Sequence, residues 1–214
     1  MKTALITIGS TREYIDPVRY ISNESSGRQG VALIRSLLKH KFKVICLYGY
    51  VSAKLVKSSN VQYIFTPNAK TMLQEAKKFK NVDLAIFNAA VNDYKVKNFS
   101  NKKIKTKNGL TIKLINNPDV LKTISSSKVK PKITVGFAYE TNDVFPNAQK
   151  KLKMKKCDYI VLNFPTVKNI IFNNLKNNGA LLSKSGTQYN LGHVTKTVFA
   201  NKIISTIIRL ENAT

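Results

Sequence analysis

Short apolar runs separated by helical patterns constrain this chain most. The runs at residues 3–8, 43–48 and 61–65 are of strand length and largely apolar, which is typical of strands buried on both faces. Residues 31–38, between the first two runs, carry apolar side chains at helical spacing. Residues 68–80, after the third run, repeat this pattern with Asn68 or Thr66 as the cap. The alternation predicts an α/β fold: a three-layer, Rossmann-like, mostly parallel sheet with helices on both faces.

The same alternation continues toward the end of the chain. Further buried strands are expected at 82–87, 132–138 and 158–163, helices at 143–156 and 195–210, and a closing hairpin of 180–182 with 188–190. We expect a single domain over residues 1–214.

Residues 95–113 differ from the rest because they are polar and rich in lysine. Asn108-Gly109 is a strong turn signal, so we expect an antiparallel hairpin of 103–105 with 111–115, in a flap or dimerisation insertion at about 95–115. A helix should follow, with Asn117 as its cap and Pro118 at its first position. Residues 164–178 show no assignable pattern and are expected to form a loop at the active site.

Residues 9–30 follow the first strand as a long polar segment, GSTREYIDPVRYISNESSGRQG. We expect strand, loop, then a helix that begins near Ser25, Ser26 and Gly27, because serine is a favoured N-cap. A helix start after the first strand of such a sheet attracts anions. Residues 88–94 also follow a strand, so both segments should meet at the carboxyl edge of the sheet, where ligands bind.

The formal net charge of +25 attracts polyanions and makes nucleic-acid binding one hypothesis. Only five of the 36 basic residues are arginines, and nucleic-acid readers favour arginine and aromatic residues. A lysine-rich composition therefore explains the charge better, and phosphorylated substrates would suit it too. A basic Rossmann-like protein that binds nucleic acid or nucleotides, without catalytic activity, remains the alternative function.

The sequence lacks the residues that metal sites, glycine-rich nucleotide motifs and membrane spans require. Cys46 and Cys157 are far apart in apolar surroundings, which fits a reducing cytoplasm, and His40 and His193 are too few for a metal site. No dinucleotide or Walker glycine motif follows a strand, and no apolar run would span a bilayer. We therefore expect a cytoplasmic protein whose lysines, amides and few carboxylates stabilise phosphate charge.

Six blocks, in order, resemble phosphopantothenoylcysteine synthetase, the ligase of coenzyme A biosynthesis. They are TREYIDPVRYISNESSG (11–27), AAVNDY (89–94), KIK (103–105), INNPDVL (115–121), GFAYET (136–141) and, after a lysine-bearing helix, CDYIVLN (157–163). The resemblance covers nearly the whole chain. Since the chain starts at the synthetase signature, it resembles a stand-alone bacterial-type form, for which no flavin is expected.

The resemblance implies two half-reactions. The carboxylate of 4′-phosphopantothenate attacks the α-phosphate of CTP, which gives an acyl-cytidylate and pyrophosphate. The amine of L-cysteine then displaces CMP and forms an amide. CTP is the implied co-substrate, Mg²⁺ accompanies it, and the metal ligands stay unassigned.

The resemblance also implies site residues, carried over position by position. Asn23 and Lys103 are the implied catalytic residues, and Arg19 would reach the neighbouring site of a homodimer. Substrate contacts fall on Arg19, Asn23, Ala89, Ala90 and Asp93. Nucleotide contacts fall on Gly9, Ser10, Ser26, Gly27, Phe87, Asn88, Ala89, Asp93, Lys103, Ile115, Asn116, Asn117, Pro118, Phe137, Lys151 and Lys155. The chain departs from the family at Asn92 and Tyr139, where small residues are usual, and in the loop after Asn163.

Overall fold

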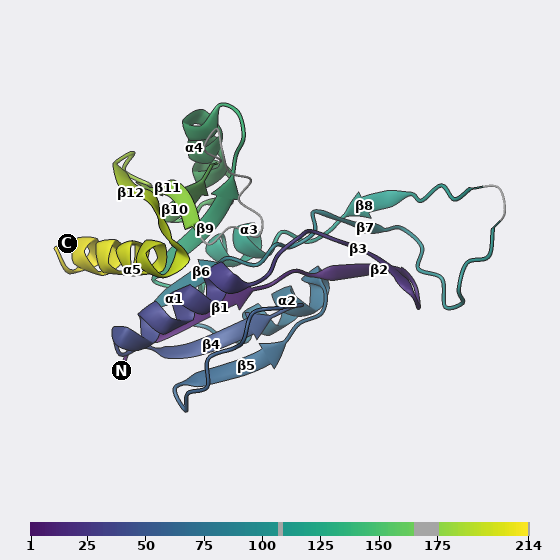
Figure 1. Ribbon diagram of the computed structural model, residues 1–214, viewed down its shortest axis with the longest axis horizontal. Coiled ribbons are helices and arrows are strands. Elements are labelled where there is room, and N and C mark those ends of the chain that lie inside the picture. Colours follow the sequence, from purple (N-terminus) through teal and green to yellow (C-terminus); the bar gives the residue numbers. More distant parts are fainter. Residues whose placement is uncertain (107–108, 165–175, 214) are drawn as a thin grey trace.

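An eight-stranded sheet runs through the molecule between two layers of helices (Figure 1). The computed structural model describes residues 1–106, 109–164 and 176–213. The strands of this sheet are β1 (Thr3–Ile8), β4 (Lys43–Tyr48), β5 (Val61–Phe65), β6 (Leu84–Phe87), β9 (Ile133–Tyr139), β10 (Tyr159–Asn163), β11 (Lys176–Ser183) and β12 (Gln188–Thr195). The order is β12-β11-β10-β9-β6-β1-β4-β5. Strand β11 pairs antiparallel with both β10 and β12, and the other neighbours pair parallel. The expected mostly parallel sheet is confirmed.

The helices cover both faces of the sheet, as expected. On one face α1 (Arg28–Lys39) packs against α5 (Lys196–Asn212), and on the other α2 (Ala69–Ala76), α3 (Val120–Ser125) and α4 (Val144–Lys155) lie in sequence. Leu5 and Ile6, successive residues of β1, belong to the two separate hydrophobic clusters beneath these layers. Side chains alternate along a strand, so each strand contributes to both cores.

The order of the parallel strands creates an opening at one edge. Read in chain order, the strands run third-second-first-fourth-fifth-sixth, so the order reverses between β1 and β6. These two strands are paired, with Thr7 opposite Phe87. Ligands of open α/β sheets bind beyond the carboxyl ends of strands at such a switch point.

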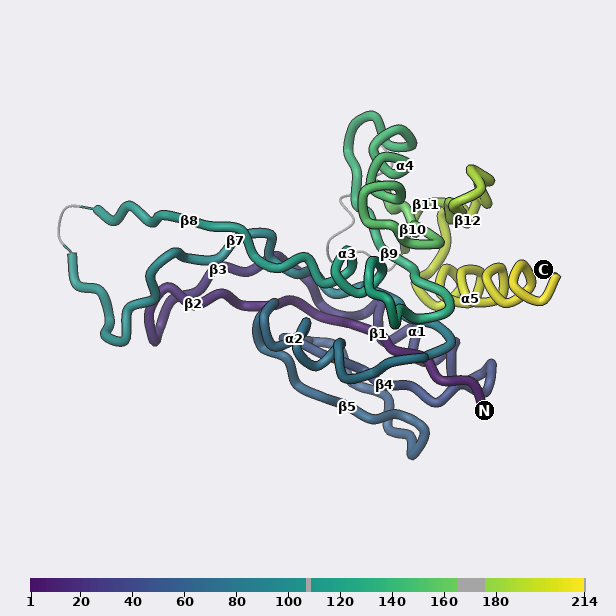
Figure 2. Tube along the Cα trace, turned by 180° about the vertical axis from the view of Figure 1, so that it is seen from behind, coloured from purple at the N-terminus to yellow at the C-terminus, as the bar shows by residue number. Residues whose placement is uncertain are grey.

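Two hairpins leave this edge as a long arm (Figures 1 and 2). One consists of β2 (Arg12–Asp16) and β3 (Arg19–Ser22), and the other of β7 (Tyr94–Val96) and β8 (Leu114–Asn116). The Ser100 N–H donates to the carbonyl oxygen of Ile15 at 3.0 Å, so the two hairpins are bonded to each other.

The arm corrects two expectations. Residues 9–30 are not a continuous loop, because Tyr14 and Tyr20 face each other across β2 and β3 with ring centroids 5.6 Å apart. The second hairpin is not formed by 103–105 and 111–115; the paired strands are 94–96 and 114–116. In the second hairpin Val96 is buried, and it lies outside the segments 103–105 and 111–115 whose alternation suggested the wrong pairing.

The cap or the end of three helices differs from the prediction. Helix α1 begins after Gly27, which is its N-cap in place of a serine, and the Ser26 hydroxyl accepts the Arg28 N–H at 3.4 Å. Helix α3 is capped by Asp119, whose carboxylate accepts the Lys122 N–H at 2.9 Å, so it starts later than expected. Helix α2 has the expected Asn68 cap but ends at Ala76. The closing hairpin is longer than expected, because β11 and β12 extend well beyond 180–182 and 188–190. The other strands and helices agree with the sequence to within two residues, and most of 164–178 lies outside the described residues.

The cysteines and histidines lie where the sequence predicted, in apolar surroundings and at the surface respectively. Cys46 and Cys157 are buried thiols without a disulfide, and burial raises the pKa of Cys157 to about 11. Both histidines are exposed. Within the described part of the chain, no helix has the length and apolarity needed to cross a membrane.

Candidate active site

A cavity of about 640 Å³ opens at the carboxyl ends of β1, β6, β9 and β10. Its walls come from the turn before α1, the segment after β6, the end of β9, helix α4 and the start of α5. The lining residues are Ser22, Asn23, Glu24, Ser25, Ser26, Gly27, Arg28, Gln29, Asn88, Ala89, Ala90, Val91, Asp93, Phe137, Ala138, Tyr139, Lys151, Asn163, Asn177 and Lys196. The cavity therefore lies at the switch point of the sheet.

A second cavity of about 140 Å³ adjoins the first. The two share five lining residues, so they form one cleft with a large and a small end: Ala89, Val91, Asp93, Phe137 and Lys151. The small end adds Phe87, Asn117, Pro118, Asp119 and Lys155. The shared residues form the middle of the cleft.

Hydrogen bonds to β1 fix the backbone of the segment after β6. The Ala89 N–H donates to the Thr7 hydroxyl at 3.2 Å, and the Ala90 N–H donates to the carbonyl oxygen of Gly9 at 2.8 Å. The Asn23 amide donates to the carbonyl oxygen of Val91 at 3.2 Å. This bond brings the end of the first hairpin against the middle of the cleft, as the sequence predicted for segments 9–30 and 88–94.

Asn92 explains one departure from the family pattern. Its side chain is 4% exposed and its amide donates to the carbonyl oxygens of Thr11 at 3.2 Å and Ile21 at 2.9 Å. The buried amide therefore joins the active-site segment to the base of the arm.

Lys151 is the central cation of the cleft. Burial lowers the pKa of its ammonium group, and the nearby Lys155 lowers it further, whereas the charges of Glu140, Asp93 and Asp119 act to raise it. The net shift is downward, so the folded protein disfavours this charge relative to water. A desolvated cation in a cleft is a candidate functional group.

Lys155 lies at the small end and forms an ion pair with Asp119. The same carboxylate caps α3, so one acidic side chain fixes both a helix start and a lysine of the cleft. This pairing orients Lys155 beside Lys151, one helical turn away on α4.

The structure brings many of the implied site residues into one cleft. These are Asn23, Ser26, Gly27, Phe87, Asn88, Ala89, Ala90, Asp93, Asn117, Pro118, Phe137, Lys151 and Lys155. Gly9 and Ser10 do not line it; the Ser10 N–H donates to the carbonyl oxygen of Tyr50 at 3.1 Å. That amide is engaged within the protein, so it is not free for the nucleotide contact that the resemblance implied at Ser10. Ile115 and Asn116 lie on or at the end of β8 in the arm, outside both cavities.

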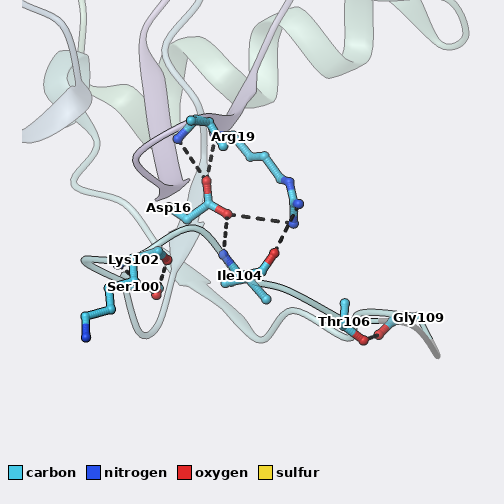
Figure 3. A network of polar contacts seen from close by, with 8 residues as sticks. Asp16, Arg19, Ser100, Lys102, Ile104, Thr106 and Gly109 are labelled. Atoms are coloured by element: carbon cyan, nitrogen blue, oxygen red, sulfur yellow. Dashed lines mark hydrogen bonds and ion pairs between the residues drawn. The ribbon is translucent and has the colours of Figure 1, made fainter.

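Arg19 and Lys103 also lie outside both cavities, on the arm. Figure 3 shows Arg19 beside Asp16 and Ile104, the residue that follows Lys103. Asp16 organises this region: its carboxylate accepts the Val18 and Arg19 N–H groups at 2.9 Å and the Ile104 N–H at 3.2 Å. The Arg19 guanidinium donates to the carbonyl oxygen of Ile104 at 3.2 Å. The segment that carries Lys103 is thus fastened to the tip of the first hairpin.

Sequence reasoning missed several polar residues of the large cavity, which include Ser22, Glu24, Arg28, Gln29, Asn163, Asn177 and Lys196. Asn163 ends β10, so the rule that ligands bind beyond strand ends would have found it. Lys196 and Asn177 carry no such signal, because β11 and the start of α5 reach the cavity only through antiparallel pairing.

The sequence of this chain is similar to that of known proteins. Residues 1–210 match the family described as DNA/pantothenate metabolism flavoprotein C-terminal domain. The chain is 38% identical over 180 residues to the coenzyme A biosynthesis bifunctional protein CoaBC of Vibrio vulnificus, with 82% of this chain and 44% of that protein covered. The chain spans about half the length, or less, of the curated relatives it matches.

Two solved structures are similar along almost the entire chain. A crystal structure of the C-terminal domain of CoaBC has a TM-score of 0.81 at 32% identity, covering 99% of this chain and 96% of the other. A Cab2 variant in complex with phosphopantothenate-cysteine has a TM-score of 0.78 at 18% identity, covering 99% and 87%. At that identity the second likeness concerns the fold alone.

Proposed function

This chain belongs to the family of the DNA/pantothenate metabolism flavoprotein C-terminal domain, and from that premise we propose that it is a phosphopantothenate–cysteine ligase of coenzyme A biosynthesis. It joins 4′-phosphopantothenate to L-cysteine at the expense of CTP. The observation that carries this proposal is the two-ended cleft, whose middle holds Asp93 and the desolvated Lys151. A cleft with two ends suits a first half-reaction between two phosphorylated reactants, 4′-phosphopantothenate and CTP.

In the first step a carboxylate oxygen of 4′-phosphopantothenate attacks the α-phosphorus of CTP. A new P–O bond forms, the bond from the α-phosphorus to the bridging oxygen breaks, and pyrophosphate leaves with that electron pair. Lys151 stabilises the charge that develops on the phosphoryl oxygens, while Asn23 orients the acyl group. Holding the reactants in line supplies the rest of the acceleration.

In the second step the amine of L-cysteine attacks the acyl carbon of the acyl-cytidylate. The C–N bond forms, the bond to CMP breaks, and the amine nitrogen loses a proton. The products are 4′-phosphopantothenoyl-L-cysteine and CMP. No side chain of the protein becomes covalently attached, in agreement with a cleft rich in amides and cations.

Mg²⁺ enters with the triphosphate of CTP in this proposal. Within the described residues no cluster of three or more His, Cys, Asp or Glu side chains could hold a metal by itself. Asp93 lines both ends of the cleft, and one carboxylate together with substrate phosphates is a usual set for Mg²⁺. When bound, the ion neutralises phosphate charge.

The arm has two roles in this proposal. Arg19 reaches the site of a second copy in a homodimer, and Lys103 contributes to acyl-cytidylate formation when the arm meets the cleft. Its exposed apolar residues favour a partner surface: Val18, Tyr20 and Phe99 are 58%, 42% and 53% exposed. We expect Lys103→Gln to slow single-turnover pyrophosphate release, because the developing phosphate charge loses a cation. An unchanged rate would remove Lys103 from the chemistry.

The proposal is tested by pyrophosphate release from CTP. With CTP and 4′-phosphopantothenate, the purified chain should release pyrophosphate before any L-cysteine is present. It should form CMP and the ligated product once L-cysteine is added. Release should fall strongly when ATP replaces CTP. No release with any nucleotide, together with salt-sensitive RNA binding, would instead favour a basic binding protein.

A further inference from the structure

A cavity of about 530 Å³ lies at the amino edge of the sheet, away from the proposed chemistry. Lys130 precedes β9, Cys157 and Asp158 precede β10, and Ser183 ends β11, so its walls lie at the opposite ends of these strands from the cleft. Among the residues that the structure describes, none lines both this cavity and the cleft. Its volume is within the range of small-molecule sites, about 300–1,000 Å³.

Four exposed lysines from three separate segments meet at this cavity. Lys130 comes from the loop before β9, Lys153 and Lys156 come from the end of α4, and Lys184 comes from the turn between β11 and β12. Interaction with the helix dipole explains lysines at the end of α4. It does not explain the two lysines from the other segments, so the fold gathers positive charge here for another reason.

Little of this charge is neutralised by the protein. Asp158 is the one acidic residue among the described residues that line the cavity. Its carboxylate accepts the Thr134 N–H at 2.9 Å and the Thr134 hydroxyl at 2.8 Å, and it pairs with Lys184 at 2.9 Å. In the described part of the chain the other three lysines form no ion pair. Three cations on one cavity without a carboxylate favour a bound anion.

Hydrogen bonds fix the wall that faces α4. The Lys184 N–H donates to the carbonyl oxygen of Asp158 at 2.8 Å, and the Gly186 N–H donates to the carbonyl oxygen of Ser183 at 2.9 Å. The hydroxyl groups of Ser183 and Ser185 are hydrogen-bonded at 2.7 Å. The turn between β11 and β12 is therefore held beside the start of β10, and the cavity is preformed.

The floor of the cavity is apolar. Leu152, Cys157 and Leu182 line it and are 6%, 4% and 1% exposed, and all three belong to the hydrophobic cluster beneath α4. An inorganic anion would use only the lysines at the rim. An apolar floor below a basic rim suits a molecule that has an apolar body as well as an anionic group.

We propose that this cavity is a second ligand site, and that its ligand is a small organic phosphate. The phosphate lies on Lys130, Lys153 and Lys156, and the apolar body lies on Leu152 and Leu182. Three unpaired cations match a group with more than one negative charge, and a phosphomonoester carries about 1.5 to 2 charges at neutral pH. Nucleotides and alkyl phosphates share this chemistry. The site does not depend on the proposed function.

The test is a titration of the whole chain followed by amide chemical shifts in NMR, because these locate the bound molecule. The amides of Cys157 and Gly186 report on the cavity, whereas those of Ala89 and Ala90 report on the cleft. ADP and decyl phosphate are the organic probes, and pyrophosphate is the probe without an apolar body. At least one organic probe should shift the cavity amides and bind there about 10-fold more tightly than pyrophosphate, the factor expected for burying about 60 Å² of apolar surface.

The two organic probes also identify the source of the phosphate. Binding of ADP supports a nucleotide at this site, and binding of decyl phosphate supports an alkyl phosphate. No shift of the cavity amides with either probe at millimolar concentration would overturn the proposal. Equal affinity for pyrophosphate and the organic probes would overturn the role of the apolar floor.

A double variant tests the basic rim. Lys130→Glu with Lys153→Glu reverses two exposed, unpaired charges, and it should weaken the organic probe in the cavity about 10- to 100-fold. Lys128→Glu with Lys150→Glu is the matched control, because it changes the net charge equally at two exposed lysines that do not line the cavity. The control should bind within about threefold of the wild type. Equal weakening by both double variants would show that only the overall charge attracts the probe, and would overturn the site.

Discussion

Replacing Lys151 by methionine should separate activity from stability. Methionine keeps the length of the side chain and removes its charge. Lys151 is half-buried, its pKa is lowered mainly by burial, and no ion pair with it occurs among the described residues. Removing this charge should therefore raise the stability of the folded protein, and it should slow the reaction because the transition state loses a cation.

The two effects have opposite signs. Loss of one preorganised charge contact in the transition state costs about 3–4 kcal/mol, so kcat for pyrophosphate release should fall about 100- to 1,000-fold. Replacing a desolvated, unpaired charge by an apolar side chain should raise the free energy of unfolding by about 1 kcal/mol, or Tm by about 2–4 °C. The wild type bears this cost below the folded-state pKa of Lys151, and the cost disappears as the pH rises toward the ordinary value of 10.5. The stability difference between the two proteins should narrow over the same pH range.

The assay is single-turnover pyrophosphate release with thermal unfolding of the same samples. Lys150→Met is the matched control, because Lys150 is exposed on the same helix and lines neither end of the cleft. A lower Tm accompanied by a proportional loss of activity would show that Lys151 is structural. Activity within fivefold of the wild type would remove it from the chemistry.

Three further predictions concern the arm and the base of the cleft. Burial alone would raise the pKa of Asp16, but the N–H groups bonded to it lower the pKa overall. Its contribution to folding stability is therefore present above about pH 4 and lost as the pH falls. Asp16→Asn should speed hydrogen exchange at the Ile104 amide, and unchanged exchange would show that Asp16 does not hold this segment. Gly30→Ala puts a methyl group 2.3 Å from the Ile8 side chain and should cost about 1–3 kcal/mol in urea unfolding, whereas a neutral result would mean that α1 can move away from β1 without loss. Arg19→Ala and Asn23→Ala, each inactive alone, should partly restore activity when mixed as heterodimers, and no recovery in verified mixed dimers would argue against a shared site.

Most of the fold could be predicted because its strands are apolar runs of the right length. The runs 3–8 and 43–48 became β1 and β4 without change. The arm could not be predicted in the same way, since its strands are short and polar and gain stability from cross-strand contacts such as Tyr14–Tyr20. Local propensity describes such pairs poorly.

The residues of the candidate site also fall into a group that the sequence could predict and a group that it could not. Residues directly after parallel strands, such as Ala89 and Asp93, could be expected in the cleft because strand ends share one edge. Asn177 and Lys196 could not, because only the antiparallel return of β11 and the packing of α5 bring them there. The amide of Ser10 was misjudged because its partner, Tyr50, lies 40 positions away.

The reversal of strand order between β1 and β6 has a consequence for how this scaffold could diversify. The hollow arises from chain connectivity, since the backbone leaves adjacent strands in different directions, and no particular side chain is needed to keep it open. Related proteins could therefore keep the same cavity and exchange the reactive side chains around it, so that a new reaction would require substitutions only in the segments that follow the strands.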